Sequence, residues 1–135
     1  MYKNILIPVI LDGSRNSELA ISAARATAAP DAMFTLLHVI EPMPVYAADY
    51  MPAETFTINR DVVERDLAKM AAGLPNGNPQ IADGRPGPRI VRWATENGCD
   101  LVVLASHRPA FSDILLGSVA AYVVRHAPCA VHVVR

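Results

Sequence analysis

The sequence predicts a single α/β domain, an open and mostly parallel sheet with helices on both faces. Short apolar runs rich in β-branched residues alternate along the chain with amphipathic stretches of helical period, which is typical of consecutive strand and helix units. The expected strands are apolar almost throughout, as in a sheet covered on both faces. A chain of 135 residues can build one hydrophobic core, so we expect residues 1–135 to form one domain.

The first part of the chain predicts two strands, a helix and a long connection. Asn4–Ile10 is the first expected strand, and a polar turn leads into a helix over Ser17–Ala28 that Pro30-Asp31 ends. The second strand, Met33–Ile40, is mostly apolar. Glu41–Ile58 shows no clear period, so we expect a connection that can act as a lid over a ligand.

A second helix and a weak strand are expected next. Asn59 is a candidate N-cap, and Gly73 and Pro75 end the helix. Its apolar stripe comprises Val62, Val63, Leu67, Met70 and Ala71. The third strand is short, near Gln80–Ala82. Gly84–Pro88 then turns into a helix with proline in its first turn, which ends at Asn97-Gly98.

The last quarter of the chain is where we expect function. From Leu101 it predicts a buried strand, a polar loop over Ala105–Leu116, a helix that starts at Gly117-Ser118, and a final strand over Ala130–Arg135. The first N–H groups of a helix have no intrahelical acceptor, and the helix dipole favours negative charge there. The start of this helix can therefore receive an anion such as phosphate.

Composition and charge exclude several classes of function. The formal net charge is −1 and no cluster of Lys and Arg is present, which argues against binding to nucleic acid. The apolar stretch at the start is too short for a membrane span and lacks the cleavage site of a signal peptide. We therefore expect a cytoplasmic protein without membrane contact. Cys99 and Cys129 lack metal-ligand spacing and are expected to be reduced structural thiols.

Ligands of open parallel sheets bind outside the carboxyl ends of the strands, where the strand order reverses. The loops after the first and fourth strands, Pro8–Ser17 and Ser106–Ser118, are the leading candidates. Gly117 would let a phosphate approach the backbone, and Ser118 could cap the helix or donate its hydroxyl to a phosphate oxygen. The competing interpretation is a tight turn with a cap.

Other side chains near these loops leave two interpretations open. His107 and Arg108 can balance phosphate charge, or they form a surface pair in a turn fixed by Pro109. His38 lies inside an apolar strand and is expected to be a core histidine. A further set could cover a planar ring or pack only within its own loop; it comprises Met43, Tyr46, Tyr50 and Met51.

No sequence motif supports enzymatic turnover. The chain has no G-x-x-x-x-G-K-[ST], G-x-G-x-x-G, G-x-S-x-G or H-E-x-x-H. Its nucleophiles and bases show no triad spacing. Slow ATP hydrolysis or phosphoryl transfer, with Ser106, Ser112 or Ser118 as phosphate acceptor, stays a minor alternative.

The chain resembles the universal stress protein family over essentially its whole length. The matching stretches are Lys3–Val9, Leu37-His38-Val39, Ser106-His107, Leu115–Ala120, Val124–Val131 and Val133–Arg135. The resemblance implies a sheet with strand order 3-2-1-4-5. It also implies an ATP site at the reversal between strands one and four, the loops that the residues alone indicate.

The resemblance also implies roles for individual residues toward ATP, AMP or ADP, with Mg²⁺ as a companion ion. Pro8 would lie by the ribose or base, and Val39 by the adenine. Leu104 and Ala105 would line the adenosine. Gly117, Ser118 and Val119 would present donors to the phosphates, beside the loop residues Ser106, His107 and Arg108.

The loop departs from the family's nucleotide-binding pattern, G-x-x-G followed by nine residues and G-[ST]. Ala105 and Arg108 replace the first two glycines, and only eight residues separate Arg108 from Gly117. The chain therefore resembles a branch whose loop reads Ser-His-Arg-Pro, in which Arg108 either fills the phosphate pocket or pairs with phosphate. Asp12 stands where an aspartate usually follows Pro-Val, displaced by Ile10-Leu11.

Two functions follow from the resemblance. The leading one is a stress-response regulatory module that binds adenine nucleotide and dimerises through the last strand, with Val131 and Val133 as interface residues. In the competing interpretation these two valines face only the monomer core. The alternative function is a nucleotide-free dimeric module of the same fold that engages a protein partner.

Overall fold

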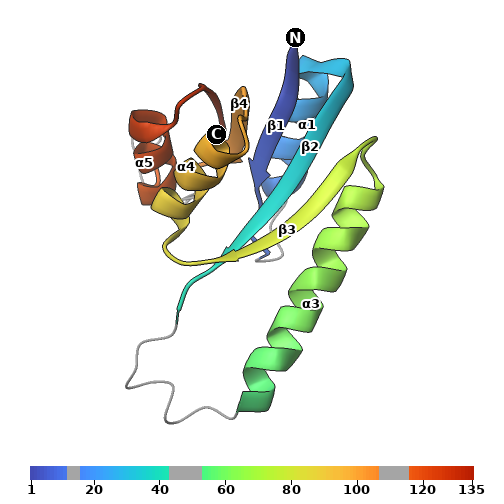
Figure 1. The fold of residues 1–135 in the computed structure, drawn as a ribbon, viewed down its shortest axis with the longest axis vertical. Coiled ribbons are helices and arrows are strands. Elements are labelled where there is room, and N and C mark those ends of the chain that lie inside the picture. Colours follow the sequence, from blue (N-terminus) through green and yellow to red (C-terminus); the bar gives the residue numbers. More distant parts are fainter. Residues whose placement is uncertain (12–15, 43–52, 107–115) are drawn as a thin grey trace.

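The computed structural model describes residues 1–11, 16–42, 53–106 and 116–135, with the backbone alone over 53–59. The described residues form five strands and four helices (Figure 1). In chain order they are β1 (Tyr2–Pro8), α1 (Asn16–Thr27), β2 (Ala28–Ile40), α3 (Ala53–Ala72), β3 (Gly77–Asp83), α4 (Pro86–Glu96), β4 (Leu101–Ala105), α5 (Ser118–His126) and β5 (Ala130–Val134). None of the described helices is long and apolar enough to cross a membrane.

The strands form one parallel sheet in the order β3-β2-β1-β4-β5. This confirms the predicted α/β class and strand order. The chain builds the sheet outward from β1 to β3 and then returns to the other side of β1 for β4. The order therefore reverses between β1 and β4, which are hydrogen-bonded neighbours.

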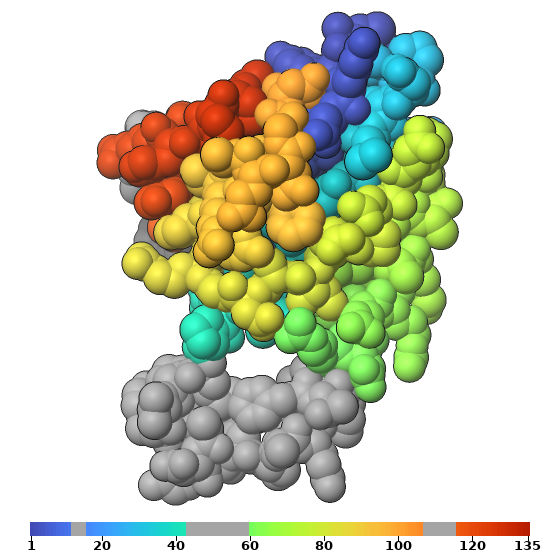
Figure 2. Space-filling model, in the orientation of Figure 1, coloured from blue at the N-terminus to red at the C-terminus, as the bar shows by residue number. Residues whose placement is uncertain are grey.

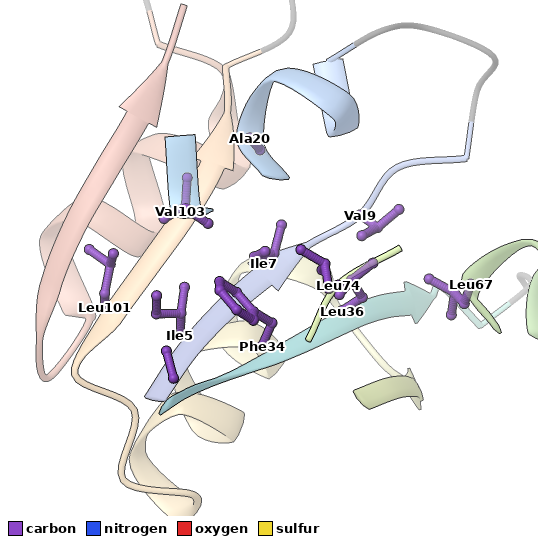
Figure 3. Packing of buried hydrophobic residues seen from close by; sticks show 12 residues of the cluster. Ile5, Ile7, Val9, Ala20, Phe34, Leu36, Leu67, Leu74, Leu101 and Val103 are labelled. Carbon is purple, nitrogen blue, oxygen red and sulfur yellow. The ribbon is translucent and has the colours of Figure 1, made fainter. Parts of the chain in front are cut away.

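Helices cover both faces of the sheet, as predicted. On one face, Ala20 and Ala24 of α1 and Leu67 of α3 join Ile5, Ile7 and other alternate strand residues in a buried cluster. Figure 3 shows this cluster, with Ala20 lying over the residues of β1 and β4. Small alanines let α1 approach the strands closely, which is why this helix lies flat on the sheet.

The other face carries α4 and α5, which pack side by side (Figure 2). Ile90 and Ala94 of α4 and Ala120 and Val123 of α5 form a second buried cluster with strand residues such as Leu6. Successive strand residues point to opposite faces, so the two clusters take alternate residues of the same strands. The same alternation shows, for each residue near a strand end, whether its side chain points toward α1 and α3 or toward α4 and α5.

The first two strands and the first helix have different bounds from those predicted. β1 covers Tyr2–Pro8 rather than Asn4–Ile10, because Val9 retains only one backbone hydrogen bond to β2, from its N–H to the Leu37 carbonyl at 2.8 Å. α1 ends at Thr27, and β2 starts at Ala28, five residues before Met33. The pairing of β1 with β2 is irregular there, with a register shift between Tyr2 and Asn4, and this irregularity accommodates Pro30 near the start of the strand.

The second helix starts earlier than predicted. α3 begins at Ala53, so Asn59 lies inside the helix and does not cap it. Leu67 and Ala71 are buried as expected, but Val62 is 45% exposed, because α3 packs one face on β2 and β3 at the border of the sheet. The prediction for Val62 was wrong, since the covered stripe is narrower than the apolar one.

The third strand is longer than predicted, Gly77–Asp83 rather than Gln80–Ala82. It is an edge strand that pairs with β2 alone. An edge strand tolerates Pro79, because the missing N–H falls on the side without a partner strand. α4 ends as predicted at Asn97-Gly98, where Gly98 has a φ of +63° and the Cys99 N–H donates to the Ala94 carbonyl.

Candidate functional site

The carboxyl ends of β1, β2 and β4 meet beside the start of α5. Val39 near the end of β2, Leu104 near the end of β4 and Val119 in the first turn of α5 all belong to the cluster on the α4 and α5 face. Pro8 ends β1, two residues after Leu6 of the same cluster, so the strand alternation directs it to that face as well. The structure therefore brings together predicted site residues from four elements.

Ser106 connects the end of β4 to the start of α5. Its N–H donates to the Val134 carbonyl at 2.8 Å, which extends the pairing with β5. Its hydroxyl accepts the Gly117 N–H at 3.1 Å. The two ends of the loop that carries His107 and Arg108 are thereby held next to each other, which the sequence alone did not indicate. Ala105 precedes this junction as the last residue of β4 and is half-buried.

α5 begins with an uncapped turn. Gly117 is the N-cap residue, with φ −61° and ψ 158°, and no side-chain hydrogen bond caps the helix. The expectation that Ser118 caps α5 was wrong, because Ser118 is already the first helical residue and is exposed. The Gly117 carbonyl accepts from the Ala121 N–H, so the N–H groups of residues 118–120 have no intrahelical acceptor.

Gly117 has no conformational or packing reason to be glycine in the described part of the chain. Its φ of −61° suits any residue. A Cβ placed on it would meet no described atom within 4 Å. Gly87 of α4 is different, because a Cβ there would come within 3.0 Å of the Tyr122 ring. Among the described residues, the missing side chain at Gly117 therefore leaves space in front of the first N–H groups of α5.

A cavity of about 190 Å³ opens beside this turn. Its lining comprises Glu41, Arg85, Pro86, Gly87, Pro88, Ser118, Val119 and Tyr122. Sequence reasoning named only Ser118 and Val119 of this set as site residues. The sequence predicts a turn at Gly84–Pro88, but only the folded structure shows that this turn and Glu41, directly after β2, lie next to α5. The cavity combines one cation, one carboxylate and an aromatic ring.

His38 and Ser17 hold the backbone that follows β1. His38 Nδ1 lies 2.9 Å from the Val9 carbonyl oxygen, so the side chain has a hydrogen-bond partner, as expected for a core histidine. The buried Ser17 hydroxyl donates to the Ile10 carbonyl at 3.2 Å and lies 3.4 Å from the Ile10 N–H, as its acceptor. Neither contact was predicted, because only the fold places these side chains beside residues 9 and 10.

Several predicted residues lie outside the described part of the chain. They are Asp12, His107, Arg108, Pro109 and Ser112, together with the ring-covering candidates Met43, Tyr46, Tyr50 and Met51. The expected lid over Glu41–Ile58 is therefore only partly described, and its last residues belong to α3. Among the residues that the structure does describe, no group of three or more His, Cys, Asp or Glu side chains could hold a metal ion.

Both cysteines are thiols set apart from this site. Cys99 is buried and Cys129 is half-buried, and neither forms a disulfide. Burial, with smaller contributions from Cys129 and Asp100, raises the pKa of Cys99 to about 11. Burial raises the pKa of Cys129 too. A raised pKa leaves little thiolate at neutral pH, which agrees with the expected structural role.

The fold defines a class of protein, an open parallel α/β sheet whose strand order reverses between β1 and β4. The model of the universal stress protein family matches residues 1–135. A universal stress protein of Thermus aquaticus is 32% identical over 139 residues, with all of both chains covered. The chain belongs to the universal stress protein family.

Two similar solved structures contain a bound nucleotide. One is a universal stress protein in complex with cAMP, with a TM-score of 0.68, 23% identity, and 99% of this chain and 97% of the other covered. The second is a universal stress protein family protein from Arabidopsis thaliana with AMP bound, with a TM-score of 0.67, 18% identity, and coverage of 98% and 90%. At these identities the likeness establishes the shared fold.

Proposed function

We propose that this protein is a regulatory module that binds an adenine nucleotide, with ATP as the ligand, at the carboxyl ends of β1, β2 and β4. The observation that carries the proposal is the open, uncapped start of α5 beside those strand ends. An unobstructed helix N-terminus with a glycine at its N-cap suits phosphate. Family relatives with bound cAMP or AMP support an adenine nucleotide as the class of ligand.

The proposed orientation follows the chemistry of the side chains. The apolar side chains of Val39 and Leu104, with Pro8, suit a flat and weakly polar base. The N–H groups of Ser118 and Val119 suit phosphate oxygens, with Ser106 at the closure of the loop. Ala105, Asp12 and His107 are proposed contacts from the resemblance alone. Mg²⁺ would bind mainly to the phosphate oxygens of the nucleotide, since this ion usually keeps several waters and has few protein ligands.

Arg108 decides whether the altered loop still accepts the phosphates. Its position replaces a glycine of the family pattern in a loop one residue shorter, the proposed mark of the Ser-His-Arg-Pro branch. A guanidinium can form two parallel hydrogen bonds with phosphate. We propose that Arg108 contacts phosphate. We also propose that the protein is a single domain and is cytoplasmic.

We also propose a homodimer formed through the free edge of β5. The Ser106 N–H donates to the Val134 carbonyl, so the N–H and C=O groups of Val134 point toward β4. In a parallel pair these groups point to opposite sides in successive residues, so those of Val131 and Val133 point to the outer edge of the sheet. Their side chains pack partly into the α4 and α5 cluster, as the competing interpretation expected. Pairing would therefore use mainly their N–H and C=O groups.

Melting temperatures with and without millimolar Mg-ATP test the proposed function. Ligand binding to the folded state raises the melting temperature, so we expect an increase for the natural chain. Arg108→Gly should reduce the increase if Arg108 contacts phosphate. No increase for the natural chain, with an increase for the variant, would mean that Arg108 blocks the pocket and would favour the nucleotide-free interaction module.

A further inference from the structure

The backbone pairing of β1 with β2 stops at an unusual point. The Val9 N–H donates to the Leu37 carbonyl at 2.8 Å, and in a continued parallel ladder the Val39 N–H would donate to the Val9 carbonyl. The described residues show no such bond. The Val9 carbonyl instead lies 2.9 Å from His38 Nδ1. Since a carbonyl oxygen only accepts, Nδ1 carries a proton.

The His38 ring thus takes the place of the backbone hydrogen bond that would otherwise join Val39 to the Val9 carbonyl. A side-chain donor is longer than a backbone N–H, so it can hold the Val9 carbonyl while the two backbones separate. The bond lies between two residues of the proposed base site, because Pro8 precedes Val9 and Val39 follows His38. His38 alternates with Val39 along β2, so its ring approaches from the α1 and α3 face. The ring therefore lies on the face of the sheet opposite to the proposed base site and does not occupy that site.

A second side chain holds the next residue. The Ser17 hydroxyl, buried in the first turn of α1 with 7% exposed, bonds with both backbone groups of Ile10. Two successive residues after β1 are thus held by side chains from β2 and α1. These hydrogen bonds are part-buried, and losing one costs stability, because a carbonyl without a donor keeps its desolvation cost.

We infer that His38 is a positioning residue of the nucleotide site. It fixes the Val9 carbonyl through its Nδ1–H group, and thereby sets the spacing between Pro8 and Val39 across which the base is held. This inference rests on the proposed function, and it deepens it by assigning a role to a residue that touches no ligand. A histidine that only fills space in the core would have no such effect on affinity.

Two amide variants separate the hydrogen bond from the bulk of the ring. In His38→Asn the side-chain nitrogen takes the place of Nδ1, one bond from Cγ, and can still donate to Val9. In His38→Gln the amide nitrogen lies one bond further out, where Nε2 was, and the donor to Val9 is lost. Both variants are polar and remove the ring, so the packing cost of losing the ring is matched between them.

Calorimetric titration with ATP and with AMP, alongside thermal melts, gives the test. We expect His38→Asn to bind within about threefold of the natural chain and His38→Gln to bind about tenfold more weakly, the cost of one part-buried hydrogen bond. We also expect His38→Gln to melt at a somewhat lower temperature than His38→Asn, because its Val9 carbonyl loses a donor. Equal affinity in all three proteins, or equal loss in both variants, would overturn the inference.

Amide spectra separate a failure of this inference from a failure of the proposed function. If the natural chain binds neither nucleotide, the proposed function is wrong. The Val9 and Ile10 amide signals then report on the backbone alone. Movement of both signals in His38→Gln but not in His38→Asn would uphold the positioning of this segment by His38. The same spectra in both variants would overturn it.

Discussion

Gly117 starts α5 with an ordinary backbone conformation, and no described atom fills the space that its missing side chain leaves. Glycine in most turns is required by a positive φ or by a close contact, and neither applies to Gly117 in the described structure. The N–H of Gly117 is used by the Ser106 hydroxyl, whereas those of residues 118–120 have no acceptor within the helix. Glycine at this position thus leaves the first N–H groups of α5 accessible and gives up the side-chain hydrogen bond that would cap the helix.

Replacing Gly117 with serine should change the stability of the fold and the affinity for ATP in different directions. Ser is a better N-cap than Gly by a few tenths of a kcal/mol, so Gly117→Ser should melt at the same or a slightly higher temperature. Its hydroxyl and Cβ would occupy the space proposed for phosphate, so the affinity for ATP should fall by about tenfold. Melting curves and calorimetric titration check this. Unchanged ATP affinity would place the phosphates elsewhere.

Cys99 gives a prediction on pH. Burial raises the pKa of its thiol from 9.0 to about 11 in the folded state. The folded state therefore binds this proton more tightly, and its contribution to stability is complete below about pH 9 and is lost as the pH rises toward about 11. Urea unfolding from pH 7 to 10.5 should show a loss of stability at high pH that is smaller in Cys99→Ala. Identical pH profiles would contradict the assignment.

At the scale of elements, the two helical layers follow from the alternation of the strands. Mostly apolar runs predicted strands covered on both faces, and this was correct for β1, β2 and β4. The starts of β2 and α3 were missed, because a proline and a stretch without period suggested loops. Tertiary pairing with β1 extends β2 backward through Pro30, and such pairing is not encoded in local sequence.

The site was predictable only where it depends on strand ends. Hydrophobic pattern placed the loops after the first and fourth strands, and the motif around Gly117 indicated phosphate. The roles of Arg85, His38 and Ser17 depend on which strands are neighbours and which carbonyls the ladder leaves unpaired. These contacts join residues distant in sequence, such as Val9 and His38, so no local signal precedes them.

The close approach of α3 to β3 gives a prediction at this scale. A Cβ on Gly77 would lie 2.2 Å from the Ala71 carbonyl oxygen, so Gly77→Ala should destabilise the protein by about 1–3 kcal/mol through overpacking. Gly73 is the matched control, because a Cβ there meets only the Met70 carbonyl at 3.5 Å. Gly73→Ala should leave stability unchanged or slightly higher. Urea unfolding compares them, and equal midpoints would contradict the packing described here.

At the scale of the whole molecule, the two edges of the sheet differ. β3 carries Pro79, and a proline on an edge discourages pairing with another chain. β5 consists of Ala130–Val134 and contains no proline, glycine or charged Asp, Glu, Lys or Arg. The edge at β5 is therefore the one suited to self-association.

Proline at residue 133 tests the proposed dimer. The alternation along β5 directs the Val133 N–H outward, so Val133→Pro removes a free donor and no bond to β4. We expect the natural chain to sediment as a dimer and the variant as a folded monomer. His132→Pro is the control, since its N–H is directed toward β4 and its loss should lower the melting temperature. A Val133→Pro variant that stays dimeric would rule out pairing through β5.

The proposed adenine-nucleotide site lies where β1, β2 and β4 end beside α5. Amide NMR spectra of the natural chain during titration with Mg-ATP test it most directly, because they report both binding and its place. We expect saturable shifts for the amides of Val39, Ser118 and Val119, with β3 and the end of α3 unaffected. No shifts at millimolar Mg-ATP, or saturable shifts confined to other parts of the molecule, would contradict the claim.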